Sequence, residues 1–219
     1  ALTRAREDLV KTRVALANRL RSELEASWPG AARIFADIDS PIALAFLERY
    51  PSPQDARSLG EKRLEAFLAR NGYCGRKKVG DLLGRLREAP RGRAAEAETE
   101  ARRTVVLSLV ATLRPLVEQI KLLSSQISGA VRSHPDGEVF LSLFRDPRAS
   151  VTAARLVSEI GDRRERYPTS ESLAADAGMC PVAVESGKRR AAIFRRACDK
   201  RLRDAVATLA DTTRHHHPC

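Results

Sequence analysis

The sequence is poor in aromatic residues. Six phenylalanines, three tyrosines and one tryptophan make up 5% of its 219 residues, and they are scattered along the chain. A protein that holds single strands by stacking bases on its side chains usually needs more exposed rings than this. The composition therefore disfavours that binding mode and fits duplex or structured nucleic acid held by its backbone.

Cysteines are few and form no recognisable framework. No two of the four stand at the spacing of metal ligands, and no Cys-x-x-Cys occurs. We therefore predict reduced thiols in a cytoplasmic protein. The four are Cys74, Cys180, Cys198 and Cys219.

Long apolar runs are missing as well. No run is long enough to span a membrane, and no signal peptide is recognisable, so we expect no membrane partner. The sequence starts at Ala1, without methionine and already inside a helical pattern. We therefore expect it to be part of a longer protein.

Strand signals are nearly absent. Apolar residues recur at three- and four-residue spacings almost everywhere, which predicts a mainly α-helical fold. We expect long coiled-coil-type helices and a small helix-hairpin-helix-like domain. The predicted divisions are a basic helix in residues 1–30, a small helical region in 31–95, a long heptad helix in 96–133 and a final domain in 134–219.

Short helices are predicted after the first one, which should run from Leu2 to Ser27. Ser40-Pro41 and Ser52-Pro53 each look like an N-cap followed by proline at the first helical position. Two further helices are expected at Gly60–Arg70 and Val79–Glu88, with the basic turn Gly75–Lys78 between them. Short helices joined by basic turns fit a helix-turn-helix-like DNA module, and a helical spacer with solvated charges fits equally well.

The strongest periodic signal lies between residues 106 and 131. Apolar residues alternate at four- and three-residue steps for about four repeats, with Ser124 in the one polar position, which is a heptad seam. Pro115 lies off the seam, so we expect a kink and not a break. The seam needs a partner, which could be the first helix folded back, a second copy of the chain, or both. Its apolar members are Val106, Val110, Leu113, Val117, Ile120, Ile127 and Val131.

Basic residues outnumber acidic ones, with 39 Lys and Arg against 28 Asp and Glu, a formal net charge of +11. An excess of this size indicates a polyanionic partner. The charge is dense near the C-terminus, where residues 185–204 hold eight cations and three acids. The candidate nucleic-acid-binding residues are Lys188, Arg189, Arg190, Arg195, Arg196, Lys200 and Arg203.

Ser186 is the candidate reactive residue. It stands beside Gly187 in a predicted loop from Met179 to about Arg190, where its hydroxyl could be presented outward. The adjacent cations could neutralise charge that develops on a phosphodiester under attack. On local chemistry alone, a basic loop with an incidental serine is the better explanation of the segment. A helix over about Ile193–Asp211 should follow.

Two other segments carry weaker signals. Residues 146–162 place a turn before a small-residue helix whose N-terminal amides could hold a phosphate, although an ordinary packed helix is the simpler interpretation. The terminal His215-His216-His217 resembles a metal tract, but we interpret it as a frayed tail. We therefore predict no metal site within this sequence.

Several ordered segments together resemble the insertion-sequence-110 family of bacterial transposases. They begin with residues 3–10, 17–20 and Trp28-Pro29-Gly30. They continue with residues 152–154, 159–162, 167–168, 173–178, Pro181, Ser186-Gly187-Lys188-Arg189 and Leu202-Arg203. The sequence departs from many relatives at residues 145–150, which lack a glycine-rich hairpin.

The resemblance implies an enzyme of three parts. An amino-terminal RuvC-like domain would bind divalent metal, Mg²⁺, through four acids that this sequence does not contain. A coiled coil would link it to a small helical domain whose essential serine matches Ser186. That serine would attack DNA and form a phosphoserine link, completed by the acidic site of a neighbouring subunit.

The resemblance also implies partners: DNA, a homodimer or homotetramer, and in some members an element-encoded guide RNA. We expect this sequence alone to be inactive as an enzyme. The alternative function is a non-catalytic basic module that binds DNA or RNA and dimerises, and a third is a purely structural oligomerisation protein.

Overall fold

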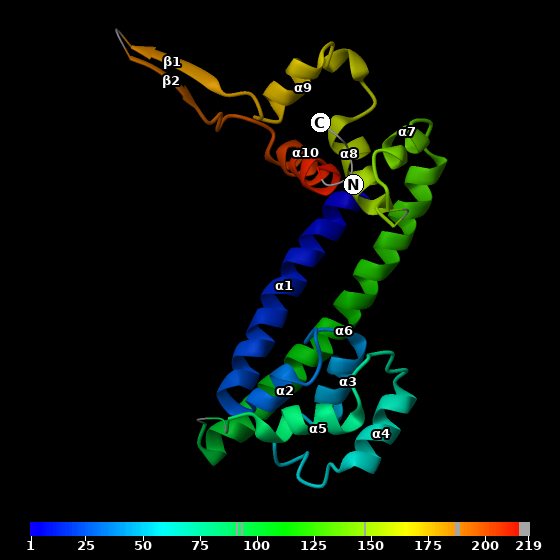
Figure 1. The fold of residues 1–219 in the computed structure, drawn as a ribbon, viewed down its shortest axis with the longest axis vertical. Helices are drawn as coiled ribbons and strands as arrows, with labels where there is room; N and C mark the ends of the chain where they lie inside the picture. Colours follow the sequence, from blue (N-terminus) through cyan, green and yellow to red (C-terminus); the bar gives the residue numbers. More distant parts are fainter. Residues whose placement is uncertain (91, 93, 147, 187–188, 215–219) are drawn as a thin grey trace. The chain divides into compact units, whose positions relative to one another are not determined.

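The computed structural model describes residues 1–90, 92, 94–146, 148–186 and 189–214, with the backbone alone at Glu96 and Arg189. It is mainly α-helical, as predicted, and the described residues form one sheet of two strands (Figure 1). The chain divides into two compact units. The middle unit comprises residues 7–121, and the terminal unit comprises residues 1–6 and 122–219.

Helices α1 and α6 each contribute residues to both units. The middle unit otherwise holds four short helices, and the terminal unit holds the remaining elements. The bounds are α1 Leu2–Ser27, α2 Pro29–Arg33, α3 Pro41–Arg49, α4 Glu61–Arg70, α5 Val79–Glu88, α6 Glu96–Ser133, α7 Gly137–Ser142, α8 Ser150–Ile160, the 3₁₀ turn η1 Arg164–Arg166, α9 Ser170–Asp176, β1 Val182–Ser186, β2 Arg189–Ile193 and α10 Lys200–Thr213.

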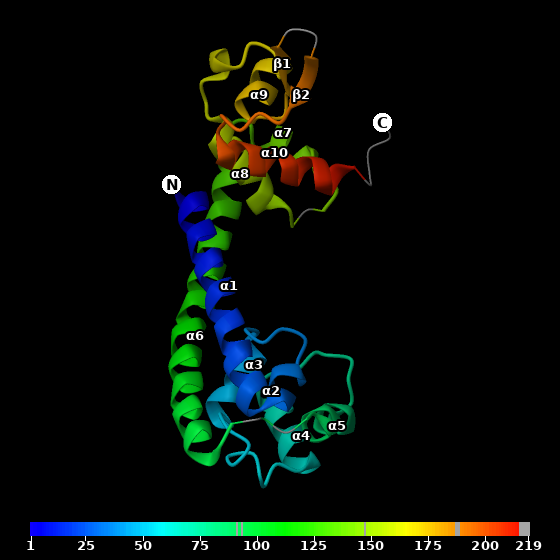
Figure 2. The ribbon, with the colours of Figure 1, turned by 90° about the vertical axis from the view of Figure 1, so that its left-hand side faces the viewer.

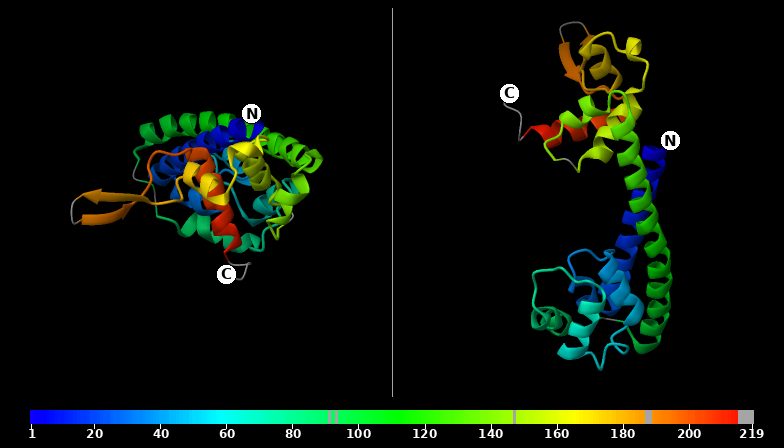
Figure 3. Two further views of the ribbon diagram at one scale, coloured as in Figure 1. Left: turned by 90° about the horizontal axis from the view of Figure 1, so that it is seen from above. Right: turned by 90° about the vertical axis from the view of Figure 1, so that its right-hand side faces the viewer.

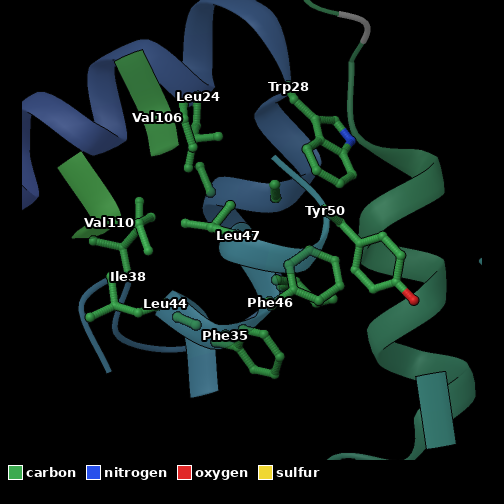
Figure 4. Close-up of a cluster of buried hydrophobic side chains, with 14 of the residues drawn as sticks. Leu24, Trp28, Phe35, Ile38, Leu44, Phe46, Leu47, Tyr50, Val106 and Val110 are labelled. Carbon is green, nitrogen blue, oxygen red and sulfur yellow. The ribbon is translucent and has the colours of Figure 1, made fainter. Parts of the chain in front are cut away.

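The middle unit is built around an aromatic core. The Phe46 ring lies 5.3–5.9 Å, centroid to centroid, from four other rings. Figure 4 shows this cluster together with Leu24 of α1 and with Val106 and Val110 of α6. Six of the ten aromatic residues of the chain lie in or against this core, although they are scattered in the sequence. The six are Trp28, Phe35, Phe46, Tyr50, Phe67 and Tyr73.

Of the two helix starts predicted from Ser-Pro pairs in the middle unit, one is observed. At α3 the Ser40 hydroxyl accepts a hydrogen bond from the Ala43 amide, with Pro41 at the first position, as predicted. The prediction at Ser52-Pro53 was wrong, because residues 52–58 form turns. There the Ser52 hydroxyl donates to the carboxylate of Asp55, at 2.6 Å, and Asp55 in turn accepts from Arg103 of α6. These bonds hold a local turn in place of a helix.

Helix α6 continues through Pro115, as the unbroken heptad phase predicts. In the middle unit, Val106, Val110 and Leu113 are buried in the same core as Leu20 and Leu24 of α1, which run antiparallel to them (Figures 1 and 2). In the terminal unit, the last seam residues Ile127 and Val131 instead pack with α8 and α10. The seam is thus covered by different neighbours along its length.

The terminal unit packs α8 against α7 and α10. Ala153, Leu156 and Ala205 are buried there, so small residues let the helices approach closely. Helix α9 begins at a cap in which Thr169 and Ser172 exchange side-chain to backbone hydrogen bonds. It ends before Gly178, whose φ of +66° is a conformation that favours glycine.

The last helix begins later than predicted. It starts at Lys200, because the Asp199 carboxylate accepts hydrogen bonds from the amides of Arg201 and Leu202. The prediction of a helix from Ile193 was wrong: Phe194 and Cys198 match its apolar spacing but precede the cap. Within the described residues, none of the helices combines the length and the hydropathy needed to cross a lipid bilayer.

Candidate functional site at the hairpin

Ser186 is the last residue of β1, and its side chain is exposed. The strands pair in antiparallel register, with Val182 opposite Ile193 and Ser186 opposite Arg189. Because side chains alternate along a strand, Ser186 shares one face of the hairpin with Val182 and Val184. The structure therefore presents the serine hydroxyl at the distal end of a partly apolar face.

The predicted loop over residues 179–190 was wrong in its main part, since residues 182–186 form a strand. A signal for it was present in the sequence. The apolar runs Val182-Ala183-Val184 and Ala191-Ala192-Ile193 lie on either side of six residues with Gly187-Lys188 at their centre, and a glycine between two such runs is typical of a hairpin. The connecting residues Gly187 and Lys188 lie outside the described part of the chain.

The hairpin extends away from the helices of the terminal unit (Figure 3). Every side chain of β1 is exposed, and so are those of β2 from Arg190 to Ile193. An isolated two-stranded hairpin is marginally stable in water, so the position of Ser186 depends on how the two ends of the hairpin are held.

Arg203 of α10 anchors the carboxyl end of the hairpin. Its guanidinium lies 4.3 Å from the centre of the Phe194 ring and donates a hydrogen bond to the backbone carbonyl of Arg195. It also donates from Nε to the carbonyl of Ala177, at 3.1 Å. One side chain thus ties α10 to the end of α9 and to the chain leaving β2. Sequence reasoning placed Arg203 among the nucleic-acid-binding residues, and its structural contacts were not foreseen.

A second set of contacts holds α9 in place. The Tyr167 hydroxyl and the guanidinium of Arg166 donate to the same carboxylate oxygen of Asp176, at 2.7 Å and 2.8 Å. The Asp199 amide donates to the Asp176 carbonyl, which joins the cap of α10 to α9. Burial, together with the hydrogen bond to Asp176, raises the pKa of Tyr167 to about 12.

The predicted cations are spread around the hairpin and its base. Arg190 lies on the face opposite Ser186, with Nε 3.4 Å from the Glu185 carboxylate. Arg195 is half-buried and borders an open hollow of about 610 Å³ with Arg196 and Phe194. Lys200 is exposed at the start of α10. Lys188 and the side chain of Arg189 lie outside the described residues.

Activation of a serine hydroxyl requires a neighbouring base. Within the described residues of the hairpin, the one acid is Glu185, which points to the opposite face and lies beside Arg190. The described residues also contain no cluster of three or more His, Cys, Asp or Glu side chains able to hold a metal ion. The His215-His217 tract falls outside them. The described residues around Ser186 thus offer a hydroxyl and positive charge, without a metal cluster.

In the turn before α8, Asp146 pairs with Arg148. The Asp146 carboxylate accepts from the backbone amide and the guanidinium of Arg148, and these bonds lower the pKa of Asp146. The Ser150 hydroxyl is buried and lies 2.7 Å from the hydroxyl of Ser128 in α6. The start of α8 is therefore engaged in contacts of the terminal unit, as in an ordinary packed helix.

Two segments that are distant in the sequence meet at the far end of α8. The Arg4 guanidinium donates to both carboxylate oxygens of Glu159, at 3.2 Å and 2.8 Å, and the hydroxyls of Thr3 and Ser158 lie 3.0 Å apart. The side chain of Glu159 is 1% exposed. The start of α1 is thereby fixed to the domain that carries Ser186.

Comparison with known proteins finds similarity to transposases and to proteins of insertion elements. Residues 149–219 match the family model described as "Transposase IS116/IS110/IS902 family". The chain is 30% identical to the mini-circle candidate transposase for IS117 of Streptomyces coelicolor, over 86% of this chain and 46% of that protein. It is 32% identical to the uncharacterized 44.8 kDa protein of insertion element IS116 from Streptomyces clavuligerus, over the same shares.

A third relative is the 43.6 kDa protein of insertion element IS110 from Streptomyces coelicolor, 30% identical over 83% of this chain and 44% of that protein. The chain thus spans less than half the length of the curated relatives it matches. No solved structure matches it significantly. The hairpin with Ser186, its anchor Arg203 and helices α8–α10 all fall within residues 149–219, the part of the chain that matches the transposase family model.

Proposed function

We propose that this chain is part of a DNA transposase that moves an insertion sequence, and that Ser186 is the nucleophile. The observation that carries the proposal is the exposure of the Ser186 hydroxyl at the end of β1, inside the matched transposase domain. The names of the relatives that mention transposition and insertion elements support the reaction class.

In the proposed reaction, the Ser186 oxygen attacks the phosphorus of a DNA phosphodiester. An Oγ–P bond forms, and the bond from phosphorus to one ester oxygen breaks, which leaves a free strand end that takes up a proton. The result is a phosphoserine link that conserves the energy of the phosphodiester for a second strand transfer. An exposed serine on a projecting hairpin can reach a phosphate held outside the domain, which a buried serine could not.

Positive charge near the hairpin supports the same role. Charge that develops on the phosphoryl oxygens is stabilised by cations already positioned around the phosphate. We assign this role to Arg190, Arg195, Arg196 and Lys200, together with Lys188 and Arg189 next to the serine. Arg203 has a positioning role, because its guanidinium contacts the chain leaving β2.

Divalent metal, Mg²⁺, belongs to the proposal only outside the described residues. These residues do not fit a metal site, since they contain no cluster of acids, histidines or cysteines. We therefore assign metal binding to a RuvC-like domain that this sequence does not contain, and assign no step of this chain to it. We also propose that the active assembly is a homodimer or homotetramer, and that an element-encoded guide RNA takes part in choosing DNA partners.

The test uses the longer protein that contains this chain, incubated with a duplex carrying one transposon end. The protein–DNA mixture is denatured, and covalently linked DNA is measured on a gel. Ser186→Ala should abolish the link while leaving binding of the duplex nearly unchanged. The matched control is Ser125→Ala, which removes an exposed hydroxyl from α6 and should leave the link intact.

A non-catalytic binding module is the second candidate, and it is favoured by the lack of a base beside Ser186 among the described residues of the hairpin. It predicts no covalent link in the wild-type protein under any metal condition, together with salt-sensitive DNA binding. A covalent link that depends on Ser186 would exclude it.

A further inference from the structure

Two sets of cations in the middle unit differ in their contacts with acids. Those on α1 and α6 are mostly paired with acids, as in Arg13–Asp39, Arg102–Glu23 and Arg114–Glu48. Those on α2, on the α4–α5 loop and on α5 are exposed, and no acid among the described residues lies within ion-pair distance of them. This second set comprises Arg33, Arg76, Lys77, Lys78, Arg85 and Arg87.

Four of these cations line two adjoining hollows. Arg76, Lys77 and Arg85 border a hollow of about 560 Å³ between residues 34–42 and 71–77. Arg85 also borders a second hollow of about 420 Å³, together with Arg33. We name Arg33, Arg76, Lys77 and Arg85 the α5 basic surface. The acids that line the same hollows are Asp37 and Glu88, so the cations remain in excess.

The loop that carries Arg76 and Lys77 is held at its start. The Asn71 amide donates to the carbonyl of Phe67, and Gly72 adopts a φ of +62° that turns the chain out of α4. The Tyr73 ring then lies 6.1 Å, centroid to centroid, from the ring of Phe35 in the core. The segment that leads to Arg76 and Lys77 is therefore fixed to α4 and to the core.

Helix α5 is fixed just as closely. Gly30 of α2 packs so near Leu86 that a methyl group at position 30 would overlap the Leu86 carbonyl oxygen. Because of this close approach, Arg33 and Arg85 are carried by two helices in direct contact. When the backbone that carries the cations is already fixed, less free energy is lost in ordering it on binding. More of the electrostatic attraction to a rigid polyanion then appears as affinity.

From these observations we infer that the α5 basic surface binds the phosphate backbone of duplex DNA. A polyanion is the expected partner, because cations on this surface are grouped around two hollows, outnumber the acids there and have no ion-pair partners among the described residues. Single-stranded nucleic acid fits less well, since the two aromatic residues that line the larger hollow, Phe35 and Tyr73, lie in or against the core. This contact lies outside residues 149–219 and does not depend on Ser186.

The test measures binding of a short fluorescent DNA duplex to this chain over a series of salt concentrations. In the surface variant, Arg76, Lys77 and Arg85 are all replaced by glutamine. The slope of log affinity against log salt should become shallower by about 2.7, at roughly 0.9 for each lost phosphate contact. The charge-matched control replaces the exposed Arg21, Arg57 and Lys62 by glutamine and should keep the wild-type slope.

Circular dichroism and thermal melting of each variant establish that it is folded. An unchanged slope in the folded surface variant would overturn the inference, and so would an equal loss in the control, which would indicate a net-charge effect alone. A loss seen with single-stranded RNA but not with duplex DNA would exclude duplex DNA as the ligand. Ser186→Ala is measured in the same way and should bind duplex DNA with the wild-type salt dependence. Failure of the nucleophile proposal can therefore be told apart from failure of this one.

Discussion

Arg4 and Glu159 are 155 positions apart in the sequence, yet both carboxylate oxygens of Glu159 accept hydrogen bonds from the Arg4 guanidinium. The carboxylate is almost fully buried, while Arg4 is 53% exposed. A buried charge of this kind needs its partner, because burial removes the water that would otherwise solvate it. This pair fixes the first turn of α1 to the end of α8.

Replacing Arg4 by alanine should therefore destabilise the terminal unit. We expect a loss of about 1–3 kcal/mol in the free energy of unfolding, the range for a hydrogen-bonded charge left without its partner. Urea denaturation followed by circular dichroism measures it. Lys11→Ala removes an ion pair with Glu7 in which the lysine side chain is 66% exposed, and it should cost no more than about 0.5 kcal/mol. Equal losses in the two variants would mean that the Arg4 pair contributes little.

Gly30→Ala should weaken the packing of α2 on α5. The added methyl group would overlap the Leu86 carbonyl oxygen, so one helix must shift, at a cost of about 1–3 kcal/mol. Gly84→Ala on α5 is the matched change, because a methyl group there meets only the Glu88 side chain, at 3.6 Å. It should stabilise the helix by about 0.5–1 kcal/mol. Melting temperatures that move in the same direction for both variants would contradict this packing.

Arg203→Lys should loosen the hairpin while leaving the unit folded. Lysine keeps the charge but has no planar fork to bridge the Ala177 and Arg195 carbonyls or to cover the Phe194 ring. Amide hydrogen exchange should accelerate over residues 182–197 and change little in α8. Lys200→Ala, which alters an exposed neighbour, should leave the exchange of the hairpin as in the wild type. Unaltered exchange in Arg203→Lys would show that the hairpin is held by other contacts.

Tyr167 gives the terminal unit a dependence on alkaline pH. Its pKa is raised from 10.0 to about 12, first by burial and then by the hydrogen bond to Asp176. The folded state thus holds this proton more tightly than the unfolded state. The stabilisation is complete below pH 10 and is lost as the pH rises from 10 towards 12. The stability of the wild type relative to Tyr167→Phe should therefore fall over this interval in paired thermal melts, and a constant difference would contradict the shift.

Long periodic elements could be predicted from the sequence, whereas tertiary details could not. The heptad spacing of Val106, Val110 and Leu113 places them on the buried face of α6, and the serine before Pro41 caps α3, both as observed. At Ser52-Pro53 the same local signal precedes turns: the Asp55 amide donates to the Ser52 hydroxyl, and the Asp55 carboxylate accepts from Ser52 and from Arg103 of α6. The contact with Arg103, from a distant helix, is not visible in a single sequence.

The hairpin illustrates the same limit at the candidate site. Ser186 was singled out by the family resemblance, since its neighbours alone favour an incidental serine in a basic loop. The helical spacing of Phe194, Cys198 and Leu202 concealed the strand that precedes them. The decisive contact is the hydrogen bond from the Leu202 amide to the Asp199 carboxylate. This cap makes α10 begin after Asp199, although the apolar spacing already begins at Phe194. Arg203 looked like one more cation, and only its bonds to two distant carbonyls identify it as an anchor.

The most direct test of the proposed chemistry is the mass of the peptide that carries Ser186, recovered after the longer protein has reacted with a transposon-end duplex. The digest should contain this peptide with a nucleotide phosphate joined to Ser186, and the adduct should vanish in Ser186→Ala while it persists in Ser125→Ala. An adduct on another residue, or strand transfer retained by Ser186→Ala, would contradict the assignment of Ser186 as the nucleophile.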